Sequence, residues 1–357
     1  MDQSEEMEVY YLIFIVAFFN CFFDFVRFKF LKGFVYFLFC VVLILIVVSR
    51  NIGVDNDSPM YEQYFYYFGK ETITDIIEGG AGHIEKGYEA LNLLVATLGG
   101  TFRTVLIIVG VATGLLNFYF FYKKSPYPFF SLLSYLSFFL LYRDFTQIRY
   151  ALCCAICFWC VHFYINKKYV NAFICFLFAI SFHNSAFILL PILPFISWVR
   201  NKYLYMLLPI PAFFIGYYFN LFPLLLQIGI SNEHMEIYKT EDGAGGYAVS
   251  IIGYAICVLF IFINKNIKDN REYLIYFRLV AIGVSLNFLF IQSAIFQRFT
   301  LLLFQFSVLL LPFIVKTIRY SSVNKMTFFV IYFMFCVFFL LYGIKMIDEQ
   351  IIRPYNP

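Results

Sequence analysis

Charge is scarce in this chain of 357 residues. Only 13% of the residues are Asp, Glu, Lys or Arg, whereas 62% are hydrophobic and the mean hydropathy is +0.80. Soluble domains carry roughly 25% charged residues, so the composition excludes a soluble protein, and no nucleic-acid partner is expected. Apolar runs of membrane-spanning length recur along the chain. They predict an all-α fold, a polytopic transmembrane helical bundle.

The sequence also lacks a signal-peptide pattern and a metal or cofactor signature. The N-terminal stretch MDQSEEMEVYY is acidic, whereas signal peptides begin with basic residues, so no cleavage is expected. Four cysteines repeat a C-x-x-C spacing inside an apolar run, where no charged partner would ionise them, so we interpret them as packing residues. They are Cys153, Cys154, Cys157 and Cys160. We expect no metal and no cofactor.

Twelve membrane crossings fit the apolar runs. Several runs are shorter than the roughly 20 residues of a full crossing, so some helices are expected to begin in the flanking loops. We interpret residues 1–357 as one integral membrane domain with larger external loops at 50–104 and 221–247. The predicted spans are 9–23, 33–49, 105–121, 127–142, 150–166, 170–182, 186–199, 203–220, 248–263, 274–291, 299–315 and 326–343.

Lysine and arginine are unevenly divided between the two sides of these spans. One set of short loops holds 15 of the 26 Lys and Arg but only three acids, whereas the other side holds 19 of the 22 acids. Short loops rich in Lys and Arg remain cytoplasmic, so this distribution places both termini outside. The basic loops are 24–32, 122–126, 167–169, 200–202, 264–273 and 316–325.

Residues 88–98, YEALNLLVATL, form an additional short apolar stretch. As a helix they reach only about 16 Å, half of the hydrocarbon thickness. We expect an external helix that rests on the membrane surface, or a re-entrant piece. The pair Lys123–Lys124 supports this interpretation, because it falls on the cytoplasmic side only if 88–98 does not cross.

Four arginines are predicted on the outer side, where positive charge is disfavoured: Arg50, Arg143, Arg149 and Arg298. Each adjoins a hydrophobic span, so it can anchor a helix end by snorkelling to lipid phosphates. Guanidinium groups also bind phosphate through paired hydrogen bonds, and a cluster of them would suit a lipid-linked diphosphate. The sequence leaves both interpretations open.

Two further polar features adjoin predicted spans on the outer side. Asp55 and Asp57 have the D-x-D spacing of a nucleotide-sugar metal site, but Gly, Asn and Asp also build turns, and sugar nucleotides are cytoplasmic. His183, in HNSAF, is either a packing residue, a proton acceptor or a donor to a substrate oxygen. Polar groups at membrane depth are tolerated when they face a cavity. We therefore expect His183 and Asn184 to line a polar cavity that is open to the outer face.

Taken in order, these motifs resemble the EpsG-like branch of the Wzy-type polysaccharide polymerases. The similarity runs through R-x-x-G-x-D, E-x-G-Y-x-x-L, a pair of arginines, H-x-S-A and a late arginine at a helix start. It covers nearly the whole chain, and it departs from the family pattern at Tyr150, where Gln is frequent. The motif residues are Arg50, Gly53, Asp55, Tyr61, Glu85, Gly87, Tyr88, Leu91, Arg143, Arg149, His183, Ser185, Arg298, Pro354 and Tyr355.

The resemblance implies a glycosyltransferase that polymerises undecaprenyl-diphosphate-linked oligosaccharide repeat units on the outer face of the bacterial cytoplasmic membrane. The four arginines would stabilise the leaving diphosphate, and Asp55 or His183 would accept the proton of the acceptor hydroxyl. Neither a metal nor a soluble sugar nucleotide is required, and a chain-length regulator is an expected partner. The implied substrate-binding residues are Tyr61, Glu85, Tyr88, Asn184 and Tyr355.

Two other classes of membrane protein fit the same composition. A lipid-linked oligosaccharide flippase would carry polar groups along its entire crossing path, whereas here the polar groups concentrate at the predicted outer side. An O-antigen ligase, or another glycosyl- or acyltransferase of the outer face, is poorly separated from a polymerase by the sequence. Gene deletion separates these two, because loss of a polymerase leaves a single capped repeat unit and loss of a ligase leaves none.

Overall fold

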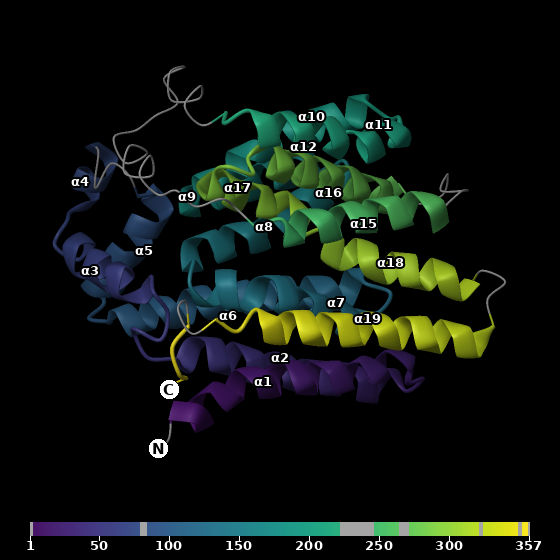
Figure 1. The fold of residues 1–357 in the computed structure, drawn as a ribbon. Helices are drawn as coiled ribbons and strands as arrows, with labels where there is room; N and C mark the ends of the chain where they lie inside the picture. The colour runs from purple at the N-terminus through teal and green to yellow at the C-terminus, as the bar shows by residue number, and fades with distance from the viewer. Residues whose placement is uncertain are drawn as a thin grey trace. The chain divides into compact units, whose positions relative to one another are not determined.

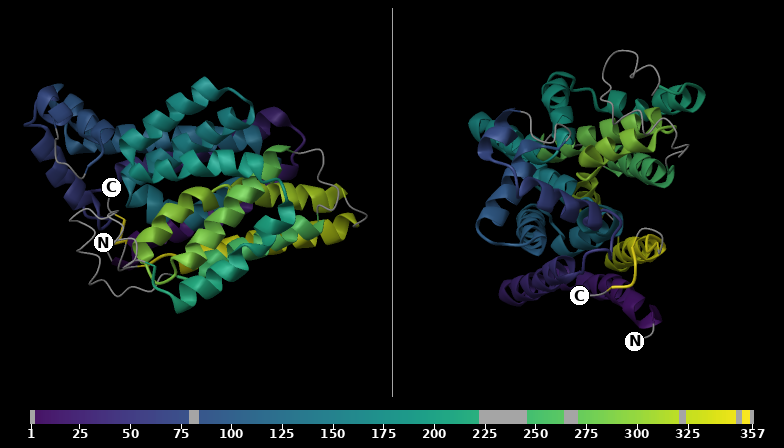
Figure 2. Two further views of the ribbon diagram at one scale, coloured as in Figure 1. Left: turned by 90° about the horizontal axis from the view of Figure 1, so that it is seen from above. Right: turned by 90° about the vertical axis from the view of Figure 1, so that its left-hand side faces the viewer.

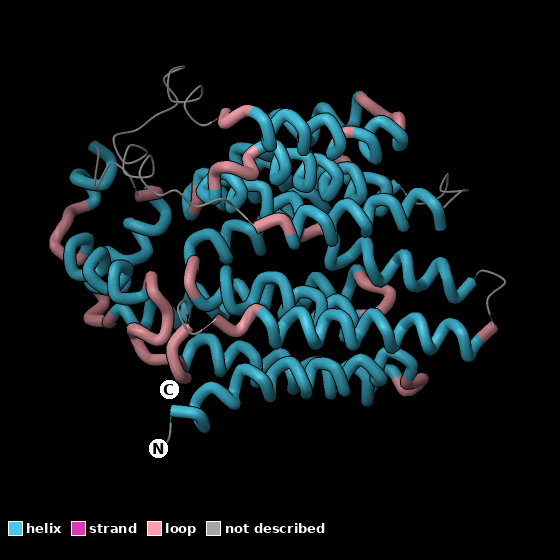
Figure 3. The backbone as a smooth tube through the Cα atoms, in the orientation of Figure 1, coloured by secondary structure: helices cyan, strands magenta, loops and turns pink. Residues whose placement is uncertain are grey.

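The computed structural model describes residues 3–78, 84–221, 246–263, 271–320, 324–348 and 352–355. Within these ranges helices form the regular secondary structure, together with one isolated β-bridge between Asp55 and Ile352 (Figure 3). The predicted class, an all-α polytopic membrane protein, is confirmed. The predicted external loop 221–247 lies almost entirely outside the described residues.

The chain divides into two compact units, Met1–Ala186 with Ser322–Pro357, and Phe187–Ser321. The first unit contains α1 (Gln3–Asn20), η1 (Cys21–Phe25), α2 (Lys29–Ser49), α3 (Ser58–Phe68), α4 (Ile73–Glu78), α5 (Lys86–Thr97), α6 (Phe102–Lys124), α7 (Pro128–Tyr135), the π-helix η2 (Leu136–Phe145), α8 (Ile148–Ile165), α9 (Tyr169–Phe182) and α19 (Lys325–Lys345). The short helix η3 (Asn184–Ile188) follows α9. The second unit contains α10 (Leu189–Trp198), α11 (Lys202–Leu207), α12 (Pro209–Tyr218), α15 (Ala248–Ile263), α16 (Arg271–Leu289), α17 (Ala294–Phe304) and α18 (Ser307–Tyr320).

Seven of the described helical stretches are long and apolar enough to cross a membrane, and three more apolar helices are shorter. The described helices therefore do not establish the predicted twelve crossings. Several predicted spans are interrupted. The span at 203–220 divides at Pro209, whose missing N–H cannot continue a helical ladder, and the span at 127–142 changes from α-helix to π-helix at Leu136.

Helices α3, α4 and α5 form a cap at one end of the first unit, where both termini also lie (Figure 1; Figure 2, right). We call this group the α3–α5 cap. Helix α5 has 12 residues, or about 18 Å, which is too short to cross a bilayer. It packs against α3 and α4 within the cap and against α6 and α9 of the bundle. The cap occupies much of the segment predicted to be external at 50–104.

Close packing between α2 and α6 positions the loop that enters the cap. Gly110 and Gly114, one turn apart on α6, both face α2. A Cβ atom on Gly110 would lie 2.7 Å from Val48 Cγ1, and one on Gly114 would lie 2.5 Å from Ile44 Cγ1. Small residues at this spacing let two membrane helices approach closely. The contact holds the C-terminal end of α2 against the bundle of the first unit.

A buried polar network joins α15, α16 and α17 of the second unit. The amide Nδ2 of Asn287 donates to Thr300 Oγ1 at 2.7 Å, and the Ser250 hydroxyl donates to Asn287 Oδ1. All three side chains are at most 4% exposed. Since buried polar groups must be paired, the network fixes α17, the helix that carries Arg298.

Candidate functional site

Arg50, the first residue after α2, forms a buried ion pair with Asp55. Its Nε donates to Asp55 Oδ2 at 3.1 Å, and the two side chains are 1% and 0% exposed. The other guanidinium nitrogens donate to the main-chain oxygens of Val47 and Phe145. Arg50 thereby ties the end of α2 to the end of η2, and its charge is neutralised inside the protein.

Asp55 also organises the turn that begins α3. Its Oδ1 accepts hydrogen bonds from the main-chain N–H groups of Asp57 at 3.0 Å and Ser58 at 2.8 Å. The chain enters this turn through Gly53, whose φ of +93° is readily adopted only by glycine. The geometry matches the turn interpretation of the D-x-D spacing.

The C-terminal residues 352–355 fasten onto this turn. The main-chain N–H of Arg353 donates to the Val54 oxygen at 2.8 Å. The Tyr355 hydroxyl, from a residue predicted to bind substrate, donates to the main-chain oxygen of Ile46 at 3.0 Å. In the structure Tyr355 therefore attaches the tail to α2.

Arg143 lies within the π-helix η2 and is also enclosed. Its Nε donates to Asp144 Oδ1 at 3.2 Å, and a terminal nitrogen donates to the Tyr135 hydroxyl at 2.9 Å. That hydroxyl donates in turn to Asp144 Oδ2 at 2.6 Å, and the guanidinium lies 4.4 Å from the centre of the Phe139 ring. With 2% of its side chain exposed, Arg143 belongs to the core of the first unit.

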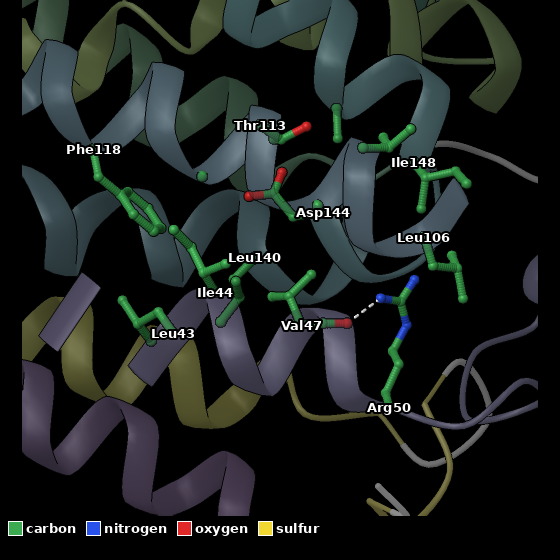
Figure 4. Close-up of a pocket in the computed structure, with 14 residues that line it drawn as sticks. Leu43, Ile44, Val47, Arg50, Leu106, Thr113, Phe118, Leu140, Asp144 and Ile148 are labelled. Atoms are coloured by element: carbon green, nitrogen blue, oxygen red, sulfur yellow. Dashed lines mark hydrogen bonds between the residues drawn. The ribbon is translucent and has the colours of Figure 1, made fainter. Parts of the chain in front are cut away.

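A small cavity adjoins both buried ion pairs (Figure 4). Arg50, Thr113 and Asp144 line it together with apolar side chains, and its volume is about 20 Å³. Sites for small organic ligands measure roughly 300–1,000 Å³. A sugar or a diphosphate does not fit here, so this cavity is not substrate space.

Arg149, in the first turn of α8, has a different environment. It forms an ion pair with Glu85, the residue before α5, and its Cζ lies 5.5 Å from the ring centres of both Tyr61 and Tyr88. Its side chain is 14% exposed, and its Nε has no hydrogen-bond partner within the described part of the chain. Among the described arginines of the predicted site, Arg149 has the most exposed side chain, with 14% against 1% for Arg50 and 2% for Arg143.

Glu85 connects this arginine to the HNSAF turn. While Oε2 accepts from Arg149, Oε1 accepts from the main-chain N–H of Asn184 at 3.0 Å. Gly87 allows the approach, because a Cβ there would lie 2.6 Å from the main-chain oxygen of Ser181. The start of α5 is thus held against the end of α9.

His183 lies between α9 and η3, outside both apolar helices. Its Nδ1 accepts a hydrogen bond from the main-chain N–H of Ser185 at 3.1 Å and lies 2.8 Å from the Ser185 hydroxyl. Burial, reinforced by the nearby Arg149 charge, lowers the pKa of His183 to about 3. The imidazole is therefore neutral, and the bond to Nδ1 places its proton on Nε2.

These contacts bring together six of the residues predicted from the sequence, which we call the Arg149 cluster. Its members are Tyr61, Glu85, Tyr88, Arg149, His183 and Asn184. Arg50, Asp55 and Arg143 are instead enclosed by partners of their own. Arg298 belongs to α17 in the second unit, and its side chain lies outside the described residues.

Two polar residues of this end were not predicted. Arg103, in the first turn of α6, donates to the main-chain oxygen of Ser49 at 2.6 Å and to Asn51 Oδ1 at 2.9 Å, where it caps α2. Asp144 pairs with Arg143 and neutralises its charge. Because Asp144 directly follows Arg143 in the sequence, this pairing could have been predicted. Within the described ranges no group of three His, Cys, Asp or Glu residues is arranged to hold a metal ion.

The fold and the cluster define a polytopic membrane protein whose polar, partly accessible site lies between a small cap and its helical bundle. The chain belongs to the EpsG family, whose family model matches residues 33–356. Membership implies a membrane protein of exopolysaccharide biosynthesis. No curated protein and no solved structure matches the chain significantly.

Proposed function

We propose that this protein polymerises undecaprenyl-diphosphate-linked oligosaccharide repeat units on the outer face of the bacterial cytoplasmic membrane. The observation that carries the proposal is the Arg149 cluster, in a chain that belongs to the EpsG family. The cluster offers a partly exposed guanidinium group for a phosphate oxygen, and two tyrosine rings beside it. Aromatic rings, a carboxylate and a guanidinium are groups suited to an anionic glycolipid.

In the proposed reaction, the bond between the anomeric carbon of the growing chain and the diphosphate oxygen breaks. The leaving undecaprenyl diphosphate keeps the electron pair, and a hydroxyl oxygen of the new repeat unit bonds to the anomeric carbon. Arg149 stabilises the charge that develops on the diphosphate. The hydroxyl proton passes to the leaving diphosphate, so no protein base is needed.

His183 acts in this proposal as a hydrogen-bond donor to a sugar oxygen. Its Nδ1 is occupied by Ser185, so Nε2 carries the proton. A group with a pKa of about 3 is also a weak proton acceptor at neutral pH. Asp55, the other predicted base, is 0% exposed and holds three donors. We therefore propose that His183 orients the substrate and that Asp55 stabilises the turn that begins α3.

Arg50 and Arg143 act as positioning residues in this scheme. Arg50 holds the turn from which α3 presents Tyr61, and Arg143 holds the segment from which α8 presents Arg149. Arg298 remains a proposed diphosphate ligand from α17. The proposed topology has twelve crossings with both termini outside, which places the α3–α5 cap on the outer face.

The test is gene deletion, complementation and gel analysis of the surface polysaccharide. A polymerase mutant keeps one capped repeat unit and loses the ladder of longer chains, whereas a ligase mutant loses both. Complementation with Arg149→Ala should fail, and complementation with Arg27→Ala, an exposed arginine between η1 and α2, should restore the ladder. Loss of the single repeat unit in the deletion strain would contradict the proposal.

A further inference from the structure

Helix α5 has two different faces. Glu85, Tyr88 and Asn92 follow one stripe, which is buried and turned toward the Arg149 cluster. On another stripe, Lys86, Ala90 and Thr97 recur at helical spacing and line a groove between α4 and α5. Helix α5 is therefore a shared wall between the Arg149 cluster and this α4–α5 groove.

The α4–α5 groove is open and mostly aliphatic, with a volume of about 670 Å³. Ile73 and Ile77 of α4 and Leu94 of α5 line it and are 70%, 76% and 56% exposed. Such a concentration of exposed aliphatic side chains is unfavourable in water and marks a surface that contacts hydrocarbon. No aromatic side chain is among the described residues that line it, so these residues provide no ring on which a sugar could stack.

The polar end of α5 supplies the connection between groove and cluster. Lys86, which lines the groove, directly follows Glu85, which pairs with Arg149. The lining stripe then runs from residue 86 to residue 97, about 16 Å along the helix. The arrangement fits one amphiphile, with an anionic head at the Arg149 end and an apolar chain along α5.

We propose that the α4–α5 groove seats the hydrocarbon chain of the lipid carrier while its diphosphate lies at Arg149. The inference rests on the proposed function for the identity of the carrier. The groove binds through contact with aliphatic side chains and the cluster through charge, so the two parts of the substrate are recognised independently. The cap thereby selects substrates by their lipid portion as well as by their sugar.

The test is photolabelling of the whole protein in phosphatidylcholine nanodiscs. The probe is a polyprenyl diphosphate with a photoreactive group in its chain, and the labelled peptides are identified by mass spectrometry. We expect labels on α4 and α5. Ala90→Trp fills the groove and should reduce this labelling about tenfold, the equivalent of removing about two buried methylene groups.

Leu98→Trp is the matched control, because Leu98 follows directly after α5, is 77% exposed and does not line the groove. It should label as the wild type does, and melting temperatures of both variants verify folding. A phosphatidylcholine with the same photoreactive group should label the groove far less. Equal labelling by the two lipids, or labels confined to other helices, would overturn the proposal.

Activity separates this inference from the proposed function. Ala90→Trp should raise KM about tenfold for a repeat unit on a long prenyl diphosphate, and leave KM unchanged for one on a short, water-soluble prenyl diphosphate. Labelling of the groove without any polymerisation by the wild type would support the groove and refute the polymerase. Polymerisation with an unchanged long-chain KM in Ala90→Trp would refute the groove alone.

Discussion

The main-chain N–H of Asn184 donates a hydrogen bond to Glu85 Oε1 at 3.0 Å, across 99 residues of sequence. The same carboxylate pairs with Arg149 through its other oxygen. One side chain thus joins three separate motifs, and the polar turn in HNSAF is held in place by the cap. The Glu85 carboxylate therefore determines the geometry of the Arg149 cluster as much as Arg149 does.

The first prediction concerns Glu85. Glu85→Gln keeps an oxygen for Asn184 but leaves the Arg149 charge unpaired, so Arg149 should shift from its place over Tyr61 and Tyr88. We expect polymerisation to fall by about a hundredfold, the effect of losing about 3 kcal/mol of transition-state stabilisation. Gel analysis of the polysaccharide ladder measures this loss. Glu62→Gln, on α3 of the same cap, is the control and should keep a normal ladder.

The second prediction separates the roles of two arginines. Arg149→Lys should reduce polymerisation about a hundredfold with little change in stability, because Lys lacks the planar guanidinium group that binds phosphate through paired donors. Arg143→Lys should instead lower the free energy of unfolding by roughly 3 kcal/mol, because it disrupts a buried pair with Asp144 and Tyr135. Thermal unfolding and specific activity of the purified variants give the two readouts. Equal stability loss in both variants would contradict this division.

The third prediction is the pH dependence of stability. The folded-state pKa of His183, about 3, lies below the ordinary value near 6.5, so the unfolded state binds this proton more tightly. The contribution of His183 is present above pH 6.5 and is lost as the pH falls toward 3. Wild-type melting temperature should therefore drop more steeply between pH 7 and pH 4 than that of His183→Gln. Parallel melting curves for the two proteins would refute a buried, neutral imidazole.

The fourth prediction is the pH dependence of rate. Because His183 stays neutral from pH 5 to pH 8, its titration should produce no fall in the polymerisation rate over this range. His183→Gln retains a side-chain N–H donor and should keep a substantial part of the rate, whereas His183→Leu should lose it. A wild-type rate that falls below pH 6.5, with that fall abolished in His183→Gln, would restore the proton-acceptor role.

The fifth prediction tests the topology. Alkaline phosphatase fused after Pro357 should be active, and green fluorescent protein fused at the same position should be dark, because the charge distribution predicts an external C-terminus. Fusions in the basic loop at Lys123–Lys124 are the internal control and should give the reverse result. Active phosphatase there would move the α3–α5 cap to the cytoplasmic side.

The sequence allowed the proximity of some predicted site residues to be anticipated, but not how deeply others are buried. Tyr61, Glu85 and Arg149 lie in recognisable motifs, so their grouping could be anticipated. The enclosure of Arg50 could not, because two of its acceptors are the main-chain oxygens of Val47 and Phe145, which no residue type reveals.

The number of membrane crossings could not be predicted from the sequence either. Hydropathy shows how long an apolar segment is. It does not show that the helix is interrupted at Pro209, or that the main-chain hydrogen-bond pattern changes where the π-helix begins at Leu136. The short length of α5 was easier to predict. Eleven apolar residues are too few for a bilayer, and the structure ends α5 at Thr97.

Residues 352–355, which we call the strap, contact the turn at Gly53, and this contact can form only late in biosynthesis. Arg353 and its acceptor Gly53 are separated by 300 residues. At about 5–20 residues per second, the ribosome makes the strap about 15–60 s after the turn that it covers. Throughout that interval Arg50 and Asp55 can pair, but the turn has no cover. The turn that begins α3 is therefore among the last parts of the first unit to mature, and a nascent chain stalled before residue 352 would expose this turn to membrane quality control.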